Sequence, residues 1–151
     1  MIVLSIGLNP SPASVTAGYY FAGRNNRFWP ALNASGLPGR VLRPGVDACR
    51  YLSETCAIGF TDVVKRPSRG AADLRVADFR HWVPHLEARI NQASPRLLWF
   101  HGKIAYRHYL RCRQQAATDL IGDYRRTGSR VPGCFSVRIP VPPMPVSIYR
   151  I

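Results

Sequence analysis

The feature that most constrains this chain is its opening apolar run, residues 1–7, which stops at Gly7-Leu8-Asn9-Pro10. A short aliphatic and β-branched run that ends in glycine and an Asn-Pro pair predicts a buried strand with one neutral polar side chain at its tip. Open α/β sheets bind their ligands at the carboxyl ends of the strands. We therefore expect the amide of Asn9 to lie at the ligand-binding edge of such a sheet.

Further along the chain, apolar runs alternate with segments of helical periodicity. Strands are expected at residues 1–7, 56–64, 96–100 and 135–139, and helices at 26–35, 76–92 and 103–115. This alternation predicts a single α/β domain over residues 1–151, a three-layer sandwich whose mostly parallel central sheet is flanked by helices. The proline-rich segment 140–145 is expected to be an irregular loop, because proline cannot continue either kind of hydrogen-bond ladder.

The charge of the chain points to a polyanionic partner. There are 21 basic and 8 acidic side chains, a net charge of +13, and the only lysines are Lys65 and Lys103. No apolar run reaches membrane-spanning length and no signal peptide opens the chain, so nucleic acid is favoured over a membrane surface. A merely solvated arginine-rich surface is the alternative. We expect a cytoplasmic monomer that binds DNA.

Neither the cysteines nor the histidines form a typical metal-binding pattern. Cys49, Cys56, Cys112 and Cys134 lack zinc-site or iron-sulfur spacing and are expected to be free thiols. Pro84 separates His81 from His85, and no carboxylate partner is evident nearby. The sequence therefore predicts no metal and no cofactor.

Four segments together resemble the mismatch-specific uracil and thymine DNA glycosylases, a family of the uracil-DNA glycosylase superfamily. Residues 7–29 resemble the family's first active-site motif, and residues 57–68 are similar to its second core strand and the loop that follows. Residues 73–80 resemble the start of its next helix, and residues 95–106 its strand-Gly-Lys-helix unit. The resemblance implies a DNA-repair enzyme that flips uracil out of DNA and hydrolyses its N-glycosidic bond without a cofactor.

The same resemblance assigns roles in a base-binding pocket. Asn9 would position the nucleophilic water and Phe21 would stack on the flipped base, with Tyr20 beside it. Main-chain groups near Leu8 and Phe21 would read the edge of the base, and Ser14 would lie next to the pocket. The alternatives are a turn residue for Asn9, a core residue for Phe21 and an ordinary loop serine for Ser14.

Asp62 is the only acid directly after an apolar run, and it could supplement the weak Asn9 amide as a catalytic group. A solvated loop residue or a helix cap is the alternative. The DNA contacts are expected in the loops, with Lys103 at a helix N-terminus where main-chain amides can hold a phosphate. The expected DNA-binding residues are Arg66, Ser68, Lys103, Met144, Ser147 and Arg150.

Two departures from the family pattern keep other functions open. Ser11 and Pro12 follow the Asn9-Pro10 pair, where the family usually has glycine, which could stiffen the loop under the base. The last motif is poorly matched at residues 139–145, and the family's terminal helix is not found before Ile151. A catalytically impaired basic DNA-binding protein of this fold is therefore one alternative. A hypoxanthine or xanthine DNA glycosylase is the other.

Overall fold

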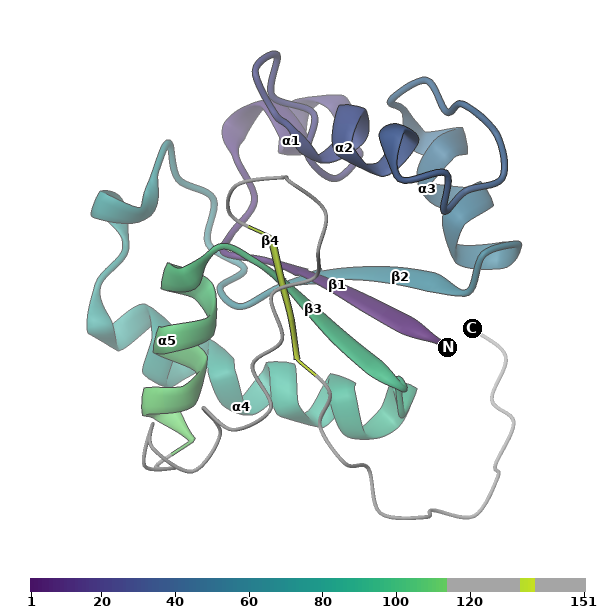
Figure 1. The fold of residues 1–151 in the computed structure, drawn as a ribbon. Helices are drawn as coiled ribbons and strands as arrows, with labels where there is room; N and C mark the ends of the chain where they lie inside the picture. The colour runs from purple at the N-terminus through teal and green to yellow at the C-terminus, as the bar shows by residue number, and fades with distance from the viewer. Residues whose placement is uncertain (114–133, 138–151) are drawn as a thin grey trace.

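The structure is a computed structural model that describes residues 1–113 and 134–137. In this part of the chain, four strands form one sheet in the order β2-β1-β3-β4 (Figure 1). Their bounds are β1 Val3–Gly7, β2 Ile58–Asp62, β3 Leu97–His101 and β4 Cys134–Val137. Strands β2, β1 and β3 are parallel, whereas β4 runs antiparallel to β3. The expected mostly parallel α/β sheet is thus confirmed.

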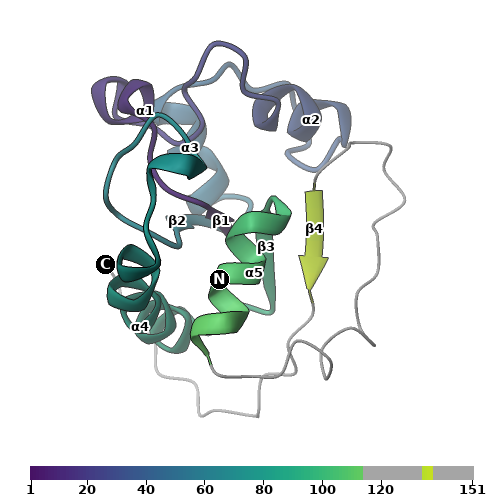
Figure 2. The ribbon, with the colours of Figure 1, turned by 90° about the vertical axis from the view of Figure 1, so that its left-hand side faces the viewer.

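Helices cover both faces of the sheet. They are α1 Pro12–Ala17, α2 Phe28–Ala34, α3 Val46–Glu54, the 3-10 turn η1 Ala71–Asp73, α4 Val76–Ala93 and α5 Lys103–Cys112. Helices α1, α2 and α3 lie on one side of the sheet, and α4 and α5 lie on the other (Figures 1 and 2). None of the helices in the described part of the chain is both long and apolar enough to cross a membrane.

The sheet separates two hydrophobic cores, because successive side chains of a strand point to opposite faces. Leu4, Ile6 and Phe100 pack with Phe79 and Tyr109 on the side of α4 and α5. On the other face, a second cluster is built from α2, α3 and β2, with Val3 and Trp99 against it; its buried members are Phe28, Trp29, Leu32, Leu42, Ala48, Leu52 and Ile58. Strands β1 and β3 are therefore held from both sides, which fixes the positions of their tips.

Helix α1 was not expected, and it accounts for Ser11 and Pro12. The Ser11 hydroxyl accepts a hydrogen bond from the main-chain N–H of Ser14 and caps the helix, and Pro12 occupies the first turn. Serine at the N-cap and proline at the first helical position are both favoured at helix starts. Gly18 then ends the helix with φ 73°. The two residues thus start a helix beside the sheet edge.

Candidate functional site

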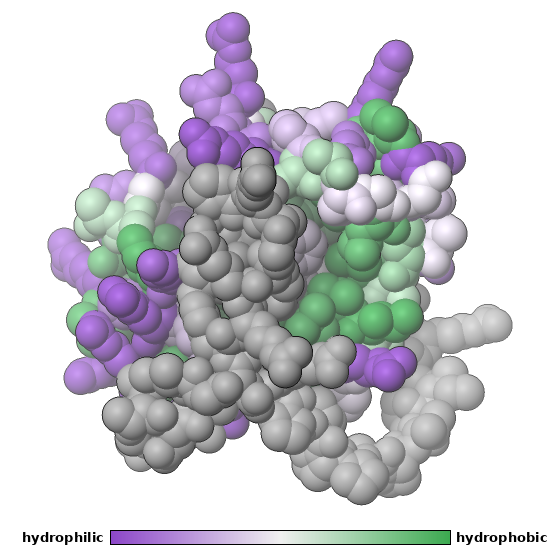
Figure 3. Space-filling model, in the orientation of Figure 1, coloured by the Kyte–Doolittle hydropathy of each residue, from purple (hydrophilic) through white to green (hydrophobic). Residues whose placement is uncertain are grey.

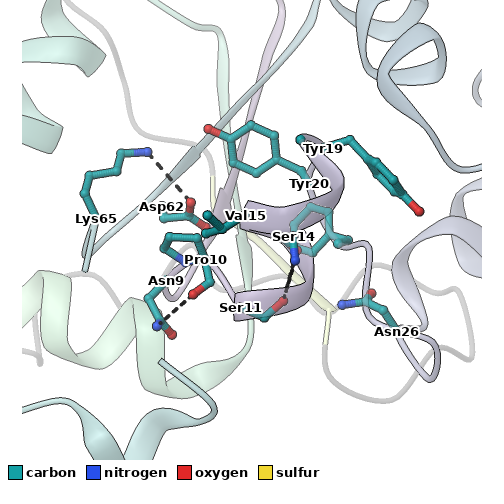
Figure 4. A pocket seen from close by; sticks show the side chains of 12 residues that line it. Asn9, Pro10, Ser11, Ser14, Val15, Tyr19, Tyr20, Asn26, Asp62 and Lys65 are labelled. Carbon is teal, nitrogen blue, oxygen red and sulfur yellow. Dashed lines mark hydrogen bonds and ion pairs between the residues drawn. The ribbon is translucent and has the colours of Figure 1, made fainter. Parts of the chain in front are cut away.

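The candidate site lies at the carboxyl ends of β1 and β2. These parallel strands pair in a register that sets Gly7 opposite Asp62. Asn9 follows Gly7 by two residues, so the amide and the carboxylate reach the same edge of the sheet. Both residues line a cavity of about 250 Å³ (Figure 4). Its lining residues are Asn9, Pro10, Ser11, Ser14, Val15, Gly18, Tyr19, Tyr20, Phe21, Asn26, Asp62 and Lys65.

The orientation of the Asn9 amide follows from its partners. Its Nδ2 donates to the carbonyl oxygens of Pro10 and Arg66, both at 3.2 Å, and to the Ser68 hydroxyl at 2.8 Å. Carbonyl oxygens can only accept, so the amino group of Asn9 must face them. All of these hydrogen bonds use Nδ2, which directs the other end of the amide, the Oδ1 acceptor, away from the loop after β2. The side chain is thus held by its amino group, and among the described residues no hydrogen bond occupies its Oδ1 acceptor.

Ser68 completes the support of Asn9. Its hydroxyl donates to the Gly70 carbonyl oxygen at 2.8 Å while accepting from Asn9, and its main-chain N–H donates to the Pro10 carbonyl oxygen at 3.2 Å. The residue is 9% exposed. The sequence predicts Ser68 as a DNA contact; in the structure its buried hydroxyl and its main-chain N–H tie the loop after β2 to the loop after β1.

Asp62 is the last residue of β2 and is only 5% exposed. Its carboxylate occupies the space beside Gly7, since a Cβ atom at Gly7 would come within 2.3 Å of Asp62 Oδ1. The missing side chain of Gly7 is therefore what admits the carboxylate. The alternative of a solvated loop residue or helix cap does not describe Asp62, which is buried at a strand end and lines the cavity.

The charge of Asp62 is set by two opposing effects. Burial raises the pKa of Asp62 to about 6, and the nearby Lys65 ammonium opposes the rise. Lys65 Nζ lies 3.8 Å from Asp62 Oδ2 and donates to Thr61 Oγ1 at 3.0 Å. Figure 4 shows the Lys65 ammonium pointing toward the Asp62 carboxylate, and both residues line the cavity. Near neutral pH the site therefore holds an ionised carboxylate in a poorly solvated position.

Aromatic rings form another wall. Tyr20 stacks on Phe60 with ring centroids 5.2 Å apart, and Phe21 stacks on Phe28 at 4.2 Å. Phe21 has φ 61°, in the left-handed region that bulky residues rarely adopt. Backbone strain of this kind persists only where the surroundings enforce it, and it is concentrated at functional sites. Phe21 was expected either to contact the base or to belong to the core. Its ring packs on the core and also lines the cavity, so the two roles are compatible.

Ser14 and Leu8 differ in their relation to the cavity. Ser14 belongs to α1 and lines the cavity, and its hydroxyl accepts from the main-chain N–H of Ala22 at 3.2 Å. It thereby ties α1 to the segment that carries the aromatic wall. Leu8 is not among the lining residues; its carbonyl oxygen accepts from the Val64 N–H at 2.9 Å and its side chain packs on the core. Its main chain joins β1 to the end of β2.

The expected DNA-binding residues have varied surroundings. Arg66 forms a two-pronged pair with Asp78, from Nε to Oδ1 and from Nη2 to Oδ2, each at 2.8 Å. This pairing lowers the pKa of Asp78 well below its usual range. The guanidinium of Arg66 thus fastens its loop to the start of α4, while Lys103 is exposed in the first turn of α5. Met144, Ser147 and Arg150 lie outside the described residues.

Two polar residues near the site were missed by sequence reasoning. The sequence pattern assigns Lys65 no role, although its position three residues after Asp62 is a usable signal. His101 ends β3, and its Nε2 lies 2.8 Å from Ser5 Oγ. Burial lowers the pKa of His101 to about 4, so the ring is neutral at physiological pH. Among residues 1–113 and 134–137, no three potential metal ligands cluster together.

The geometry is that of a cavity at the tips of parallel strands, walled by an amide, a carboxylate and aromatic rings. A family model of the uracil DNA glycosylase superfamily matches residues 2–143. The chain belongs to this superfamily. Membership implies DNA glycosylase-type activity and the binding of DNA.

Proposed function

We propose that this protein is a monofunctional DNA-repair glycosylase of the mismatch-specific uracil/thymine type, which excises uracil and other deaminated or mismatched bases from DNA. The observation that carries the proposal is the convergence of the Asn9 amide and the Asp62 carboxylate on one cavity beside Phe21. A base inside a duplex is shielded by its neighbours, so such an enzyme must flip the nucleotide into a pocket before reacting. The cavity is the proposed receptor for the flipped base.

In the proposed mechanism, Asn9 acts by orientation. Its Nδ2 is held by three acceptors, and its Oδ1 receives a hydrogen bond from the attacking water. A neutral amide is a weak base, so its contribution is the placement of the water near C1′ of the sugar. The hydrogen bonds from the loop after β2 spare the enzyme the cost of ordering this side chain during the reaction.

Asp62 supplies the charge in this mechanism. An ionised carboxylate stabilises the positive charge that develops on the sugar as the glycosidic bond breaks, and it can accept a proton from the water. It also repels the departing base anion. Because Asp62 ends β2 on the same side as Asn9, we place it on the water and sugar side of the cavity, with the base against the rings of Tyr20 and Phe21.

The basic surface suits a DNA duplex. The segment that follows the aromatic wall carries Arg24 and Arg27, both exposed, around Asn26, which lines the cavity. Figure 3 shows long hydrophilic side chains projecting along the upper and left margins of the molecule. We place the duplex over the surface that carries Arg24 and Arg27, where the arginines can contact phosphates of the strand that carries the flipped nucleotide.

The test is a panel of labelled duplexes with uracil, thymine, hypoxanthine or xanthine opposite each base, followed by alkali to cleave abasic sites. We expect strand cleavage at uracil after alkali and none before it. Excision of hypoxanthine or xanthine but not of uracil would show that uracil is not the substrate. Tight binding without any excision would identify a DNA-binding protein whose catalysis has been lost, and would refute the proposed activity.

A further inference from the structure

We propose that Lys65 is a positioning residue that holds the Asp62 carboxylate ionised and in place, and so sets the acid limit of base excision. The inference rests on the proposed function and adds a residue to its site. Lys65 Nζ lies 3.8 Å from Asp62 Oδ2 and donates to Thr61 Oγ1 at 3.0 Å. It also lies 6.0 Å from the centre of the Tyr20 ring. Three neighbours thus locate the ammonium group.

The need for a cation follows from the burial of Asp62. A carboxylate removed from water favours its protonated form, which can no longer accept a proton from an attacking water. An opposite charge within about 4–6 Å restores the ionised form. Burial lowers the pKa of Lys65 in turn, and Asp62 opposes that change, so each group sustains the charge of its partner.

The other titratable groups around this pair come from two elements. Tyr20, on the segment after α1, has its pKa raised to about 12 by burial and by Asp62, so it stays neutral. Helix α4 contributes His85 and Arg89, which line a small cavity together with Asp62 and Lys65. Arg89 lowers the pKa of Lys65, and in the described part of the chain the ion pair of Asp62 is the one with Lys65. The geometry therefore assigns the stabilising charge to Lys65.

The experiment compares single-turnover excision by wild type, Lys65→Met and Lys65→Arg from about pH 5 to about pH 9. Removal of the cation should shift the acid limb of the Lys65→Met profile upward by about 1 pH unit or more, since one nearby charge moves a carboxyl pKa by about 1–3 units. Lys65→Arg keeps the positive charge, so its acid limb should lie close to that of wild type. Arg89→Gln is the matched control from the same cavity, and it should leave the limb in place.

A second readout makes the inference independent of catalysis. NMR titration of the Asp62 side-chain carboxyl in the DNA-free protein should show a higher pKa in Lys65→Met than in wild type. An unchanged Asp62 titration in folded Lys65→Met would overturn the proposal, as would an equal shift in Arg89→Gln. If no duplex is excised but the titration shifts as expected, the proposed function fails while the coupling between Lys65 and Asp62 stands.

Discussion

Asp62 and His101 end the two strands that flank β1, yet the fold gives them opposite surroundings. Asp62 faces Lys65 and lines the cavity. His101 packs edge-on against the stacked rings of Phe21 and Phe28, with centroids 4.9 and 5.2 Å away, and contacts Ser5. Both side chains lose water, but within the described residues Asp62 has a partner of opposite charge and His101 has none. One strand tip is therefore built to carry charge and the other to behave as part of an aromatic wall.

This difference separates reaction from support at the edge of the sheet. The Asn9 and Asp62 side supplies groups that can act on water or on a developing charge. The His101 side supplies rings that pack against Phe21, whose backbone has φ 61°. Substitutions on the first side should change the rate of excision, and substitutions on the second should change base capture or stability.

The largest expected effect is that of Asn9→Ala. Loss of the positioned acceptor should lower single-turnover excision roughly 100-fold or more, because water placement acts in the transition state. His101→Gln, on the opposite side, should stay within about a few fold of wild type. Gel-shift measurements on the same duplex should show nearly unchanged affinity for Asn9→Ala. Wild-type excision by this variant would remove Asn9 from the proposed mechanism.

The second prediction concerns stability and pH. Burial raises the Asp62 pKa to about 6 from an ordinary 3.8, so the folded state holds this proton more tightly and the free energy of unfolding falls as pH rises through that window. His101 acts in the reverse direction. Its pKa falls to about 4 from 6.5, so its contribution is complete above about pH 6.5 and is lost on acidification. The two slopes oppose each other in wild type.

Asp62→Asn should therefore raise the free energy of unfolding at pH 7, by on the order of 1–3 kcal/mol. In this variant, the loss of stability on acidification that His101 causes should no longer be opposed by Asp62. His101→Gln should show the opposite pH dependence, with the free energy of unfolding rising as the pH is lowered toward 4. Urea denaturation of both variants at about pH 7 and about pH 4 measures the slopes. Parallel pH profiles in the two variants would contradict the assigned pKa directions. A gain in stability with a loss of excision would mark Asp62 as a group retained for its reactivity.

Phe21→Ala tests the contact between the two sides. Its ring lines the cavity and touches His101, and loss of one base-aromatic stack should weaken capture of the flipped base by about 1–3 kcal/mol. The concentration of enzyme at half-maximal single-turnover excision reports this loss. Phe28→Leu, which alters the ring beneath Phe21, controls for a general loss of packing. If both variants unfold alike, Phe21 is a core residue and another group must contact the base.

The smallest expected effect is that of Ser68→Ala. It removes one of the acceptors that orient the Asn9 amide and should slow excision about 2- to 10-fold, the range for one hydrogen bond. Ser53→Ala, an exposed serine of α3, is the matched control. A slowed rate with unchanged DNA affinity would support positioning. Weakened DNA affinity at a normal rate would instead support Ser68 as a DNA-binding residue, as the sequence predicts.

The sequence was most informative where chemistry and chain direction coincide. The apolar run before Gly7 and the Asn-Pro pair predict both the strand and the place of Asn9, and the structure has them at the sheet edge. Helix α1 was missed because Pro10 and Pro12 suggest a loop, although Ser11 and Pro12 are also favoured at a helix start. Local composition could not distinguish the two.

The support of the site could not be read in the same way. Ser68 acts through Asn9, 59 residues earlier, and His101 packs against Ser5, 96 residues earlier. Such partners are set by the pairing of β1 with β2 and β3, which no local pattern specifies. Lys65 is an intermediate case. Its spacing from Asp62 can be read from the sequence, but the importance of its positive charge depends on how deeply the carboxylate is buried.

Gly7 links the composition of one strand to that of its neighbour. A side-chain carbon at this position would meet the Asp62 carboxylate, so the two residues share a single allotment of space. Gly7→Ala should then be tolerated only when residue 62 is made smaller, and Asp62→Ala should relieve the clash that Gly7→Ala creates alone. Directed evolution of this site would have to change both strands together, which restricts the routes by which its chemistry can drift.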